Sequence, residues 1–108
     1  MNDHMPVAEH LRKDHDAENT ADDAELIRQF KNGSEGAFTV LVKRYQPRLL
    51  QVATLLLKNE YDAMDMVQDV FVKVYYSLKS FREDSALYTW LYRILYNRCI
   101  TYLRKKKI

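Results

Sequence analysis

The sequence predicts an all-α fold, a compact bundle of about four helices that follows a flexible N-terminal tail. Three observations predict it. The 108 residues include only two Gly and two Pro, which leaves few turn signals for a multi-stranded sheet. Apolar residues make up 47% of the chain, enough for one modest core. They recur at intervals of three and four residues, the period of an amphipathic helix. We therefore expect one small helical domain over residues 22–108.

Residues 1–21 form an acidic stretch without helical or strand periodicity, which predicts a disordered tail. His4, His10 and His15 all fall in it, and a floppy segment does not preorganise metal ligands. The sequence has no signal-peptide-like apolar run and no run of the roughly 18 apolar residues that span a membrane. Cys99 has no second cysteine to pair with. We expect a soluble, cytoplasmic protein that does not contact a membrane.

Charge is distributed unevenly along the chain. Residues 1–35 hold nine Asp/Glu against four Lys/Arg, whereas residues 36–108 hold six against thirteen. This segregation favours an anionic partner for the C-terminal part, although an ordinary solvated surface gives the same count.

The first two helices begin at residues that can cap them. Asp22 and Asp23 supply a side-chain acceptor and negative charge at the start of one helix, which residues 31–33 close. Ser34 can cap the next. Their apolar residues at helical spacing are Leu26, Ile27 and Phe30, then Phe38, Leu41, Val42, Tyr45, Leu49, Val52, Ala53 and Leu56. Pro47 removes a backbone donor, so we expect a kink near Tyr45 or two abutting helices.

A third helix is expected from about residue 62 to 79, with Asp62 as its cap. Its predicted core side consists of Ala63, Met64, Val67, Val70, Phe71, Val74, Tyr75 and Leu78. The opposite side carries Asp62, Asp65, Gln68, Asp69 and Lys73, with Met66, Val72 and Tyr76 interleaved. A protein-binding face mixes apolar anchors with charges in this way, but scattered exposed apolar residues are also ordinary. Periodicity alone leaves both interpretations open.

The last helix follows a break at residues 80–85 and runs to about Arg104. One polar stripe consists of Thr89, Arg93, Asn97, Thr101 and Arg104, flanked by Trp90; Leu87, Leu91, Ile94, Leu95 and Tyr102 lie toward the other side. Arginine can pair with phosphate, asparagine can hydrogen-bond a base edge, and an aromatic ring can stack on an unpaired base. The stripe favours nucleic-acid contact; the alternative is a core helix with a basic outer face.

Two residues of this helix need separate interpretations. Arg98 projects onto the apolar side, where it either extends past the edge of the core or pairs with an acidic residue. Cys99 is most simply a small buried hydrophobe.

The sequence carries no motif for covalent chemistry. A Gly-rich phosphate loop, a nucleophile elbow, HExxH and paired cysteines are all missing from it. Asp62, Asp65 and Asp69 recur on successive turns, but no His or Glu of a neighbouring helix is placed to complete a metal shell. We expect neither an enzyme nor a cofactor or metal site.

The segments AMDMVQDVF and FREDSALYTWLYRILYN, at residues 63–71 and 81–97, resemble region 2 of the bacterial extracytoplasmic-function (ECF) sigma factors. The resemblance extends upstream through ELIRQFKNGSEGAFTVLVKRY and covers about residues 22–105. It implies a helical transcription initiation domain in the bacterial cytoplasm. Such a domain binds the clamp helices of the β′ subunit of core RNA polymerase and helps to melt the promoter minus-ten element. An anti-sigma factor is a further implied partner.

The resemblance also implies site residues. Polymerase contacts fall on Asp62, Asp65, Met66, Gln68, Asp69 and Val72. A promoter-reading loop falls on residues 81–88 and implies a pocket for one base flipped out of the non-template strand. DNA contacts fall on Arg82, Asp84, Ser85, Ala86, Tyr88, Trp90, Arg93, Asn97, Thr101 and Arg104. Trp90 supports strand separation or the helix itself.

One departure from the family leaves alternatives open: the sequence ends at Ile108, before the linker and helix-turn-helix region 4 of family members. Glu83 stands where the loop often has a small residue and leaves the base preference open. One alternative is a sigma-like protein-interaction module, either an anti-sigma target or a polymerase-binding decoy, without promoter recognition of its own. Another is a generic helical protein that binds the major groove of duplex DNA.

Overall fold

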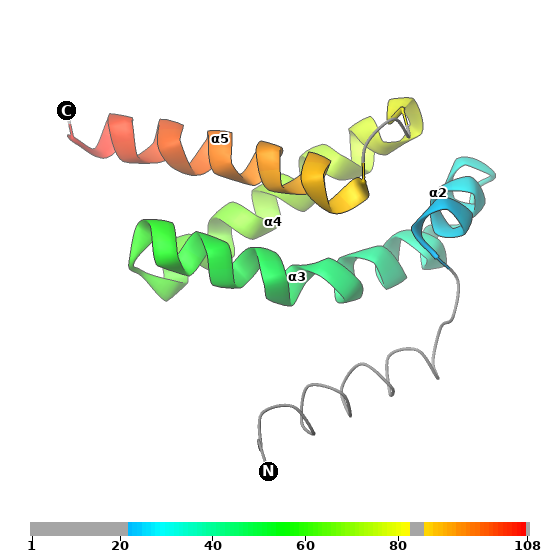
Figure 1. Ribbon diagram of the computed structural model, residues 1–108, viewed down its shortest axis with the longest axis horizontal. Helices are drawn as coiled ribbons and strands as arrows, with labels where there is room; N and C mark the ends of the chain where they lie inside the picture. The colour runs from blue at the N-terminus through cyan, green and yellow to red at the C-terminus, as the bar shows by residue number, and fades with distance from the viewer. Residues whose placement is uncertain (1–21, 83–85, 108) are drawn as a thin grey trace, which may run out of the picture.

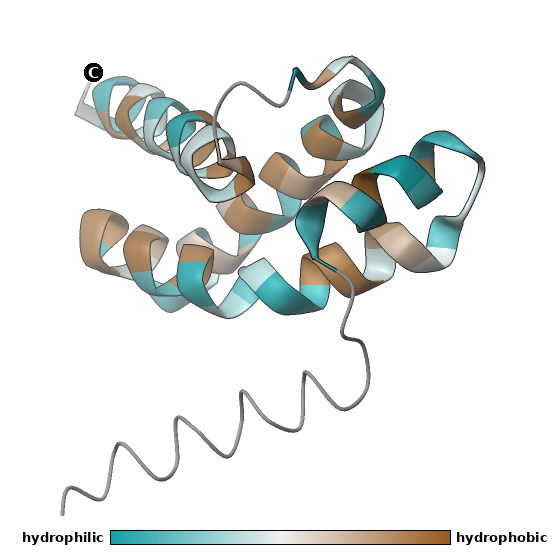
Figure 2. Ribbon diagram, turned by 45° about the vertical axis from the view of Figure 1, so that its right-hand side comes forward, coloured by the Kyte–Doolittle hydropathy of each residue, from teal (hydrophilic) through white to brown (hydrophobic). Residues whose placement is uncertain are grey.

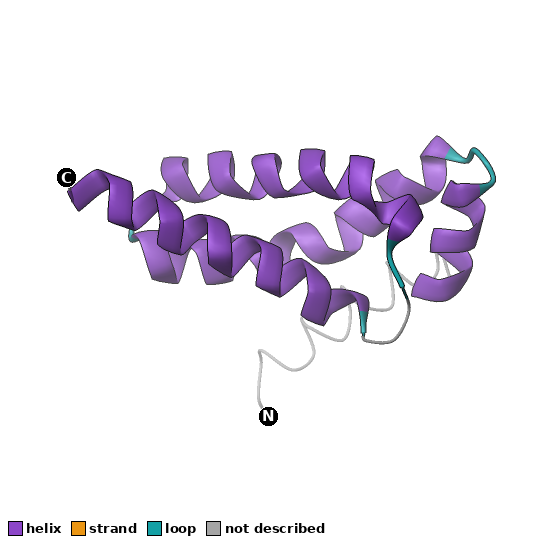
Figure 3. Cartoon of the chain, turned by 90° about the horizontal axis from the view of Figure 1, so that it is seen from above, coloured by secondary structure: helices purple, strands orange, loops and turns teal. Residues whose placement is uncertain are grey.

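The computed structural model describes residues 22–82 and 86–107 and consists there of helices joined by short loops (Figure 3). The elements are α2 (Asp23–Lys31), α3 (Glu35–Leu57), α4 (Glu60–Ser77), the 3₁₀ turn η1 (Leu78–Ser80) and α5 (Leu87–Lys107). Helices α3, α4 and α5 pack against one another, and α2 packs on α3 and η1 at one end of the bundle (Figure 1). The all-α prediction is confirmed. The expected tail, including its three histidines, lies outside the described residues.

The first two helices begin where the sequence predicts. Asp22 caps α2 by accepting a hydrogen bond from the Glu25 backbone N–H at 2.9 Å, and the Ser34 hydroxyl accepts one from the Ala37 N–H at 3.2 Å. Between the two helices, Gly33 has a φ of 103°, in the left-handed region that glycine adopts without a steric penalty. The short α2–α3 turn is therefore fixed by the Ser34 cap and one glycine.

Helix α4 corrects the prediction that Asp62 is its cap. The helix begins at Glu60, two residues earlier, and the cap is Asn59, whose side chain accepts a hydrogen bond from the Asp62 N–H at 2.9 Å. Asn59 has an extended backbone and so occupies the position from which a side chain can reach the free amides of the first turn. The Asp62 carboxylate is thereby left to contact α5.

Pro47 lies inside α3 without interrupting it. Of the forms expected from the sequence, the pair of abutting helices is wrong, because α3 is one helix from Glu35 to Leu57 (Figure 1). The physical reason lies on the buried side of the helix. Leu41 and Tyr45 before the proline and Leu49 after it all belong to the core, so their burial maintains the helix across the missing backbone donor.

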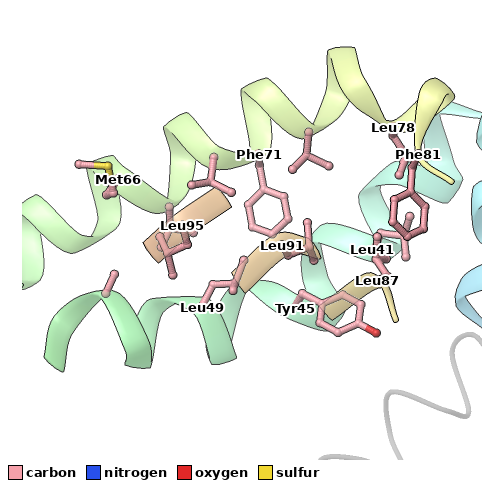
Figure 4. Packing of buried hydrophobic residues seen from close by; sticks show 14 of the residues in the cluster. Leu41, Tyr45, Leu49, Met66, Phe71, Leu78, Phe81, Leu87, Leu91 and Leu95 are labelled. Atoms are coloured by element: carbon pink, nitrogen blue, oxygen red, sulfur yellow. The ribbon is translucent and has the colours of Figure 1, made fainter. Parts of the chain in front are cut away.

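One core is formed by an apolar stripe from each helix. Figure 4 shows how core residues of α3, α4 and α5 face one another. The largest fully buried side chains are Leu26, Ile27, Leu49, Val67, Val70, Leu78, Leu91, Leu95 and Cys99. Hydrophobic and hydrophilic residues alternate around the helices accordingly (Figure 2). Cys99 is buried, as predicted, and burial raises the pKa of its thiol.

On α4 the core side is shifted from the one that the sequence predicts. Met64 and Tyr75, predicted to be core residues, are only half-buried, whereas Met66, predicted on the outer side, is buried. The reason is that α5 packs along this side of α4, so that Met66 lies in the seam between the two helices with Ile94. Helical projection of one segment does not reveal where a second helix will pack.

An ion pair and a hydrogen bond join α2 to α3 at Asp23. The Arg44 Nη1 lies 2.9 Å from one carboxylate oxygen of Asp23, and the Tyr45 hydroxyl donates to the other. Burial raises the pKa of Tyr45 well above its ordinary value, and the hydrogen bond to Asp23 raises it further.

We predict that Leu95→Ala lowers the free energy of unfolding by about 2–5 kcal/mol, because the truncation leaves a cavity among core side chains. Leu55→Ala is the matched control: Leu55 is 77% exposed, so its truncation should change the same quantity by less than about 0.5 kcal/mol. Urea unfolding followed by circular dichroism measures both. Equal losses in the two variants would contradict the assignment of the core.

We predict that Tyr45→Phe flattens the loss of stability at alkaline pH. In the unfolded chain a tyrosine ionises near pH 10. The raised pKa of Tyr45 keeps it protonated in the folded chain, so stability falls as the pH rises above about 10. Removing the hydroxyl removes this contribution, whereas Tyr75 and Tyr102, whose pKa values are also raised by hydrogen bonds to carboxylates, keep theirs. Urea unfolding between pH 8 and 11 tests this; an unchanged slope would contradict it.

Candidate protein and nucleic-acid interfaces

A groove between α3 and α4 includes part of the mixed face predicted on α4. It has a volume of about 340 Å³ and is lined by Phe38, Val42, Gln46, Gln68, Phe71, Val72, Tyr75 and Tyr76. Val72 is 59% exposed and Tyr76 is 80% exposed. Asp65 is also exposed. Apolar side chains beside polar ones are the composition of a protein-binding surface.

The groove is bordered by a cluster of aromatic rings in mutual contact. The rings of Phe30, Phe38 and Tyr75 lie 5.1–5.5 Å apart between centroids. The Tyr75 hydroxyl donates to Glu35 at 2.7 Å, and this hydrogen bond, followed by burial, raises the pKa of Tyr75. Rings held from three helices give the groove a wall of fixed shape.

A second groove lies where α3 ends and α4 begins. Its volume is about 560 Å³, and Leu50, Thr54, Glu60, Tyr61, Met64 and Asp65 line it. Tyr61 is 85% exposed, and Leu55 on the same part of α3 is also exposed. Neither Tyr61 nor Leu55 was predicted from the sequence to be part of an exposed apolar surface. The available signal was that Leu55 falls outside the apolar stripe projected for its helix.

Two acidic residues of the predicted polymerase face contact α5 instead of standing free. Asp62 accepts a hydrogen bond from the Tyr102 hydroxyl at 3.0 Å and lies 3.9 Å from Lys106 Nζ. Asp69 lies 3.4 Å from Arg98 Nη2, so Arg98 pairs with an acidic residue, one of the two alternatives left open. The hydrogen bond to Asp62 raises the pKa of Tyr102.

The polar stripe predicted on α5 is largely at the surface. Arg93, Asn97, Thr101 and Arg104 are exposed, and Thr89 is half-buried. The 21 residues of α5 include six Lys/Arg and no Asp/Glu. A long helix with only positive charges attracts an anionic partner such as a nucleic-acid backbone.

A cavity of about 490 Å³ separates the outer parts of α4 and α5. Its lining residues are Met66, Asp69, Lys73, Ile94, Asn97, Arg98, Thr101, Tyr102 and Lys105. The cavity thus connects the stripe residues Asn97 and Thr101 with Asp69 of the predicted polymerase face. Met66 reaches only this seam, so it is not the exposed anchor that the sequence predicted.

The predicted promoter-reading loop is held at both of its ends by ring contacts. Phe81 is buried, and its ring centroid lies 4.8 Å from that of the half-buried Trp90. Tyr88 is half-buried beneath the Arg48 guanidinium, which lies 3.8 Å from its ring centroid. Arg82 and Ala86 are exposed.

The remaining predictions on this loop, Asp84 and Ser85, lie outside the described residues. Arg48, whose contact with Tyr88 depends on α3, was not found from the sequence.

The described residues contain neither a metal-binding cluster nor a membrane-spanning helix. No three His, Cys, Asp or Glu side chains within residues 22–82 and 86–107 are arranged to hold a metal ion. None of the helices in this part of the chain combines the length and apolar character needed to cross a membrane.

Comparison with known proteins shows which family this chain resembles. The sigma-70 region 2 family matches residues 41–108. The ECF RNA polymerase sigma-E factor of Haemophilus influenzae is 42% identical over 87 residues, which are 81% of this chain and 45% of that protein. The RNA polymerase sigma-H factor of Pseudomonas aeruginosa is 38% identical over 81 residues, 75% of this chain and 42% of that protein. The chain thus spans less than half the length of these relatives.

One solved structure is similar to this chain in both fold and sequence. The NMR structure of an engineered region 2 of sigmaE, in complex with GTAAAA, superposes with a TM-score of 0.74 at 32% identity. The superposition covers 82% of this chain and 93% of that one. Since the family match includes more than half of the residues and the helical fold is shared, the chain belongs to the sigma-70 region 2 family.

Proposed function

We propose that this chain is a transcription initiation domain that binds core RNA polymerase through α3 and α4 and promoter DNA through α5. The observation that carries the proposal is the presence of two chemically different surfaces on one core. One combines exposed apolar side chains with carboxylates, and the other is a helix of six basic residues without an acidic one. Membership of the sigma-70 region 2 family supports both assignments, and we place the domain in the bacterial cytoplasm.

The polymerase contact is proposed at the groove between α3 and α4. Val72 and Tyr76 offer apolar side chains there and Gln68 offers a polar one, while Asp65, about one turn earlier on α4, lines the second groove. A partner helix laid into the first groove buries its apolar stripe there and can pair a basic residue with Asp65. The clamp helices of the β′ subunit are the occupant that the family implies. An anti-sigma factor that covered the same groove would block polymerase binding.

The DNA contact is proposed on the exposed stripe of α5. Arg93 and Arg104 are placed to neutralise phosphates, and Asn97 is a side chain that can pair with a base edge. Arg98 and Lys105 line the adjoining cavity and add positive charge beside Asn97. The preferred substrate is the non-template strand of the minus-ten element, because α5 begins directly after the loop that the family uses for base reading.

Capture of one flipped base is proposed for the loop around Asp84, Ser85 and Ala86. The ring contact between Phe81 and Trp90 supports this proposal, because it attaches the start of the loop, at Phe81, to α5. Flipping a base costs a few kcal/mol, which phosphate contacts and polymerase binding together must offset. Trp90 is half-buried against Phe81, so we assign it to support of the loop, not to stacking on DNA.

We predict that Asp65→Ala/Gln68→Ala weakens association with core RNA polymerase by at least about tenfold, the effect of losing 1.4 kcal/mol at an interface. Co-purification and a titration with labelled chain measure it. Lys43→Ala/Gln51→Ala is the control, because both residues are exposed on α3 and line none of the three cavities. Wild-type chain that folds but does not associate with polymerase would refute the polymerase assignment.

We predict that Arg93→Ala/Asn97→Ala lowers affinity for a single-stranded minus-ten oligonucleotide by about 1–3 kcal/mol and leaves polymerase association intact. Fluorescence anisotropy at several salt concentrations measures it; removal of one phosphate contact should reduce the salt slope by about one. Unchanged DNA affinity with intact polymerase association would favour the protein-interaction module. A preference for duplex DNA would favour the major-groove alternative.

A further inference from the structure

The cavity between α4 and α5 has a surplus of positive charge. Lys73 from α4 and Arg98 and Lys105 from α5 line its volume of about 490 Å³, against the single carboxylate of Asp69. The lining therefore carries a net charge of +2. Arg98 is shared with Asp69, but the 3.4 Å between Nη2 and the carboxylate oxygen is longer than in a strong charge-assisted hydrogen bond.

Two of these cations lack an internal partner. Within residues 22–82 and 86–107, neither Lys73 nor Lys105 forms an ion pair or a side-chain hydrogen bond with another residue. A lysine ammonium group donates up to three hydrogen bonds. The cavity therefore presents two ammonium groups that an anion from outside can bind without breaking an existing contact.

The two lysines are attached at opposite ends of the cavity. Helices α4 and α5 run in opposite directions (Figure 1), with Asp69 next to Arg98. This register places Lys73 level with Ile94, eleven residues before Lys105. At 1.5 Å per residue, the two lysines are about 16 Å apart along the helix axis. Because their stems are flexible, both ammonium groups can move toward the centre of the cavity.

The middle of the cavity is partly apolar. Met66, which is 8% exposed, and the half-buried Ile94 and Tyr102 contribute to its lining. Asn97 and Thr101 add an amide and a hydroxyl group from α5. Apolar side chains with a few polar groups, around a volume of about 300–1,000 Å³, are typical of a site for a small organic ligand.

We propose that this cavity binds a small organic anion with two negatively charged groups and a less polar body between them. Lys73 pairs with one charged group and Lys105 with the other, while the body lies in the apolar middle. Nucleotides with two separated phosphate groups are the class that meets these requirements, since Asn97 can also hydrogen-bond a base edge. The binding does not depend on the function proposed above, because neither polymerase nor DNA takes part in it.

The test is isothermal titration calorimetry of the full chain with adenosine 3′,5′-bisphosphate. Lys73→Ala/Lys105→Ala should weaken binding by at least about tenfold, because each substitution removes a hydrogen bond between charged groups. Adenosine monophosphate, which lacks the second phosphate, should bind wild type more weakly by a similar factor. Lys31→Ala/Lys43→Ala is the matched control, because it removes the same charge at exposed positions that line none of the three cavities.

Three results would overturn the proposal. One is a wild-type chain that does not bind the bisphosphate at millimolar concentration. Another is an equal loss of affinity in the Lys73/Lys105 variant and in its control, which would reduce the effect to net charge. The third is binding of inorganic pyrophosphate as tight as that of the bisphosphate, because the middle of the cavity would then have no part in binding.

A nucleic-acid strand offers the same phosphate groups, so a parallel titration with oligothymidylate separates the two sources. If the Lys73/Lys105 variant loses affinity for the strand and wild type does not bind the bisphosphate, the cavity belongs to a strand and the proposal is overturned. If wild type binds the bisphosphate but neither polymerase nor promoter DNA, the ligand site is supported and only the function proposed above is refuted.

Discussion

The structure depends on one shared core into which α3, α4 and α5 each place a single apolar stripe. Leu49, Val67 and Leu95, one from each helix, are fully buried. A helix that buries one stripe leaves the rest of its circumference to solvent, and those remaining sides carry the two proposed interfaces. The groove residues of α4 and the stripe of α5 are therefore fixed relative to one another by the packing beneath them. Loss of that packing would affect both surfaces together.

Ion pairs at the surface join the helices but contribute little to the stability of the fold. Asp69 with Arg98, and Asp62 with Lys106, join α4 to α5 at positions where the side chains are partly exposed. Exposed ion pairs contribute about 0–1 kcal/mol each and weaken with salt, so the core carries most of the stability. Their position has a further consequence: Asp62 and Asp69, two of the polymerase contacts that the family resemblance implies, are paired with cations of α5.

Much of the fold could be predicted from the sequence, because periodicity and caps are local properties. The stripe of α2 and the caps at Asp22 and Ser34 follow from residues within a few positions of one another. The predictions were wrong where the environment of a residue depends on a segment that is distant in the sequence. Met66 is buried because α5 packs beside it, and Pro47 is accommodated because the core is continuous on both sides of it.

The same distinction holds for the candidate site. The α5 stripe could be projected from one helix, and its exposed residues are those that the projection put outward, with Thr89 half-buried. The ion pair of Arg98, the cation of Arg48 over Tyr88 and the groove between α3 and α4 each need two helices whose relative placement the sequence does not give. The proposed partners come from the family resemblance, because the geometry alone does not identify them.

NMR titration of the labelled chain tests most directly whether this domain holds two separate binding surfaces. The Val72 methyl groups and the Asn97 side-chain amide report on the two surfaces, since both residues are exposed. The β′ clamp helices should shift the Val72 signals and leave the Asn97 amide unchanged, and the minus-ten strand should do the reverse. If both ligands shift the same signals, or if DNA shifts Val72 alone, the account of two surfaces is contradicted.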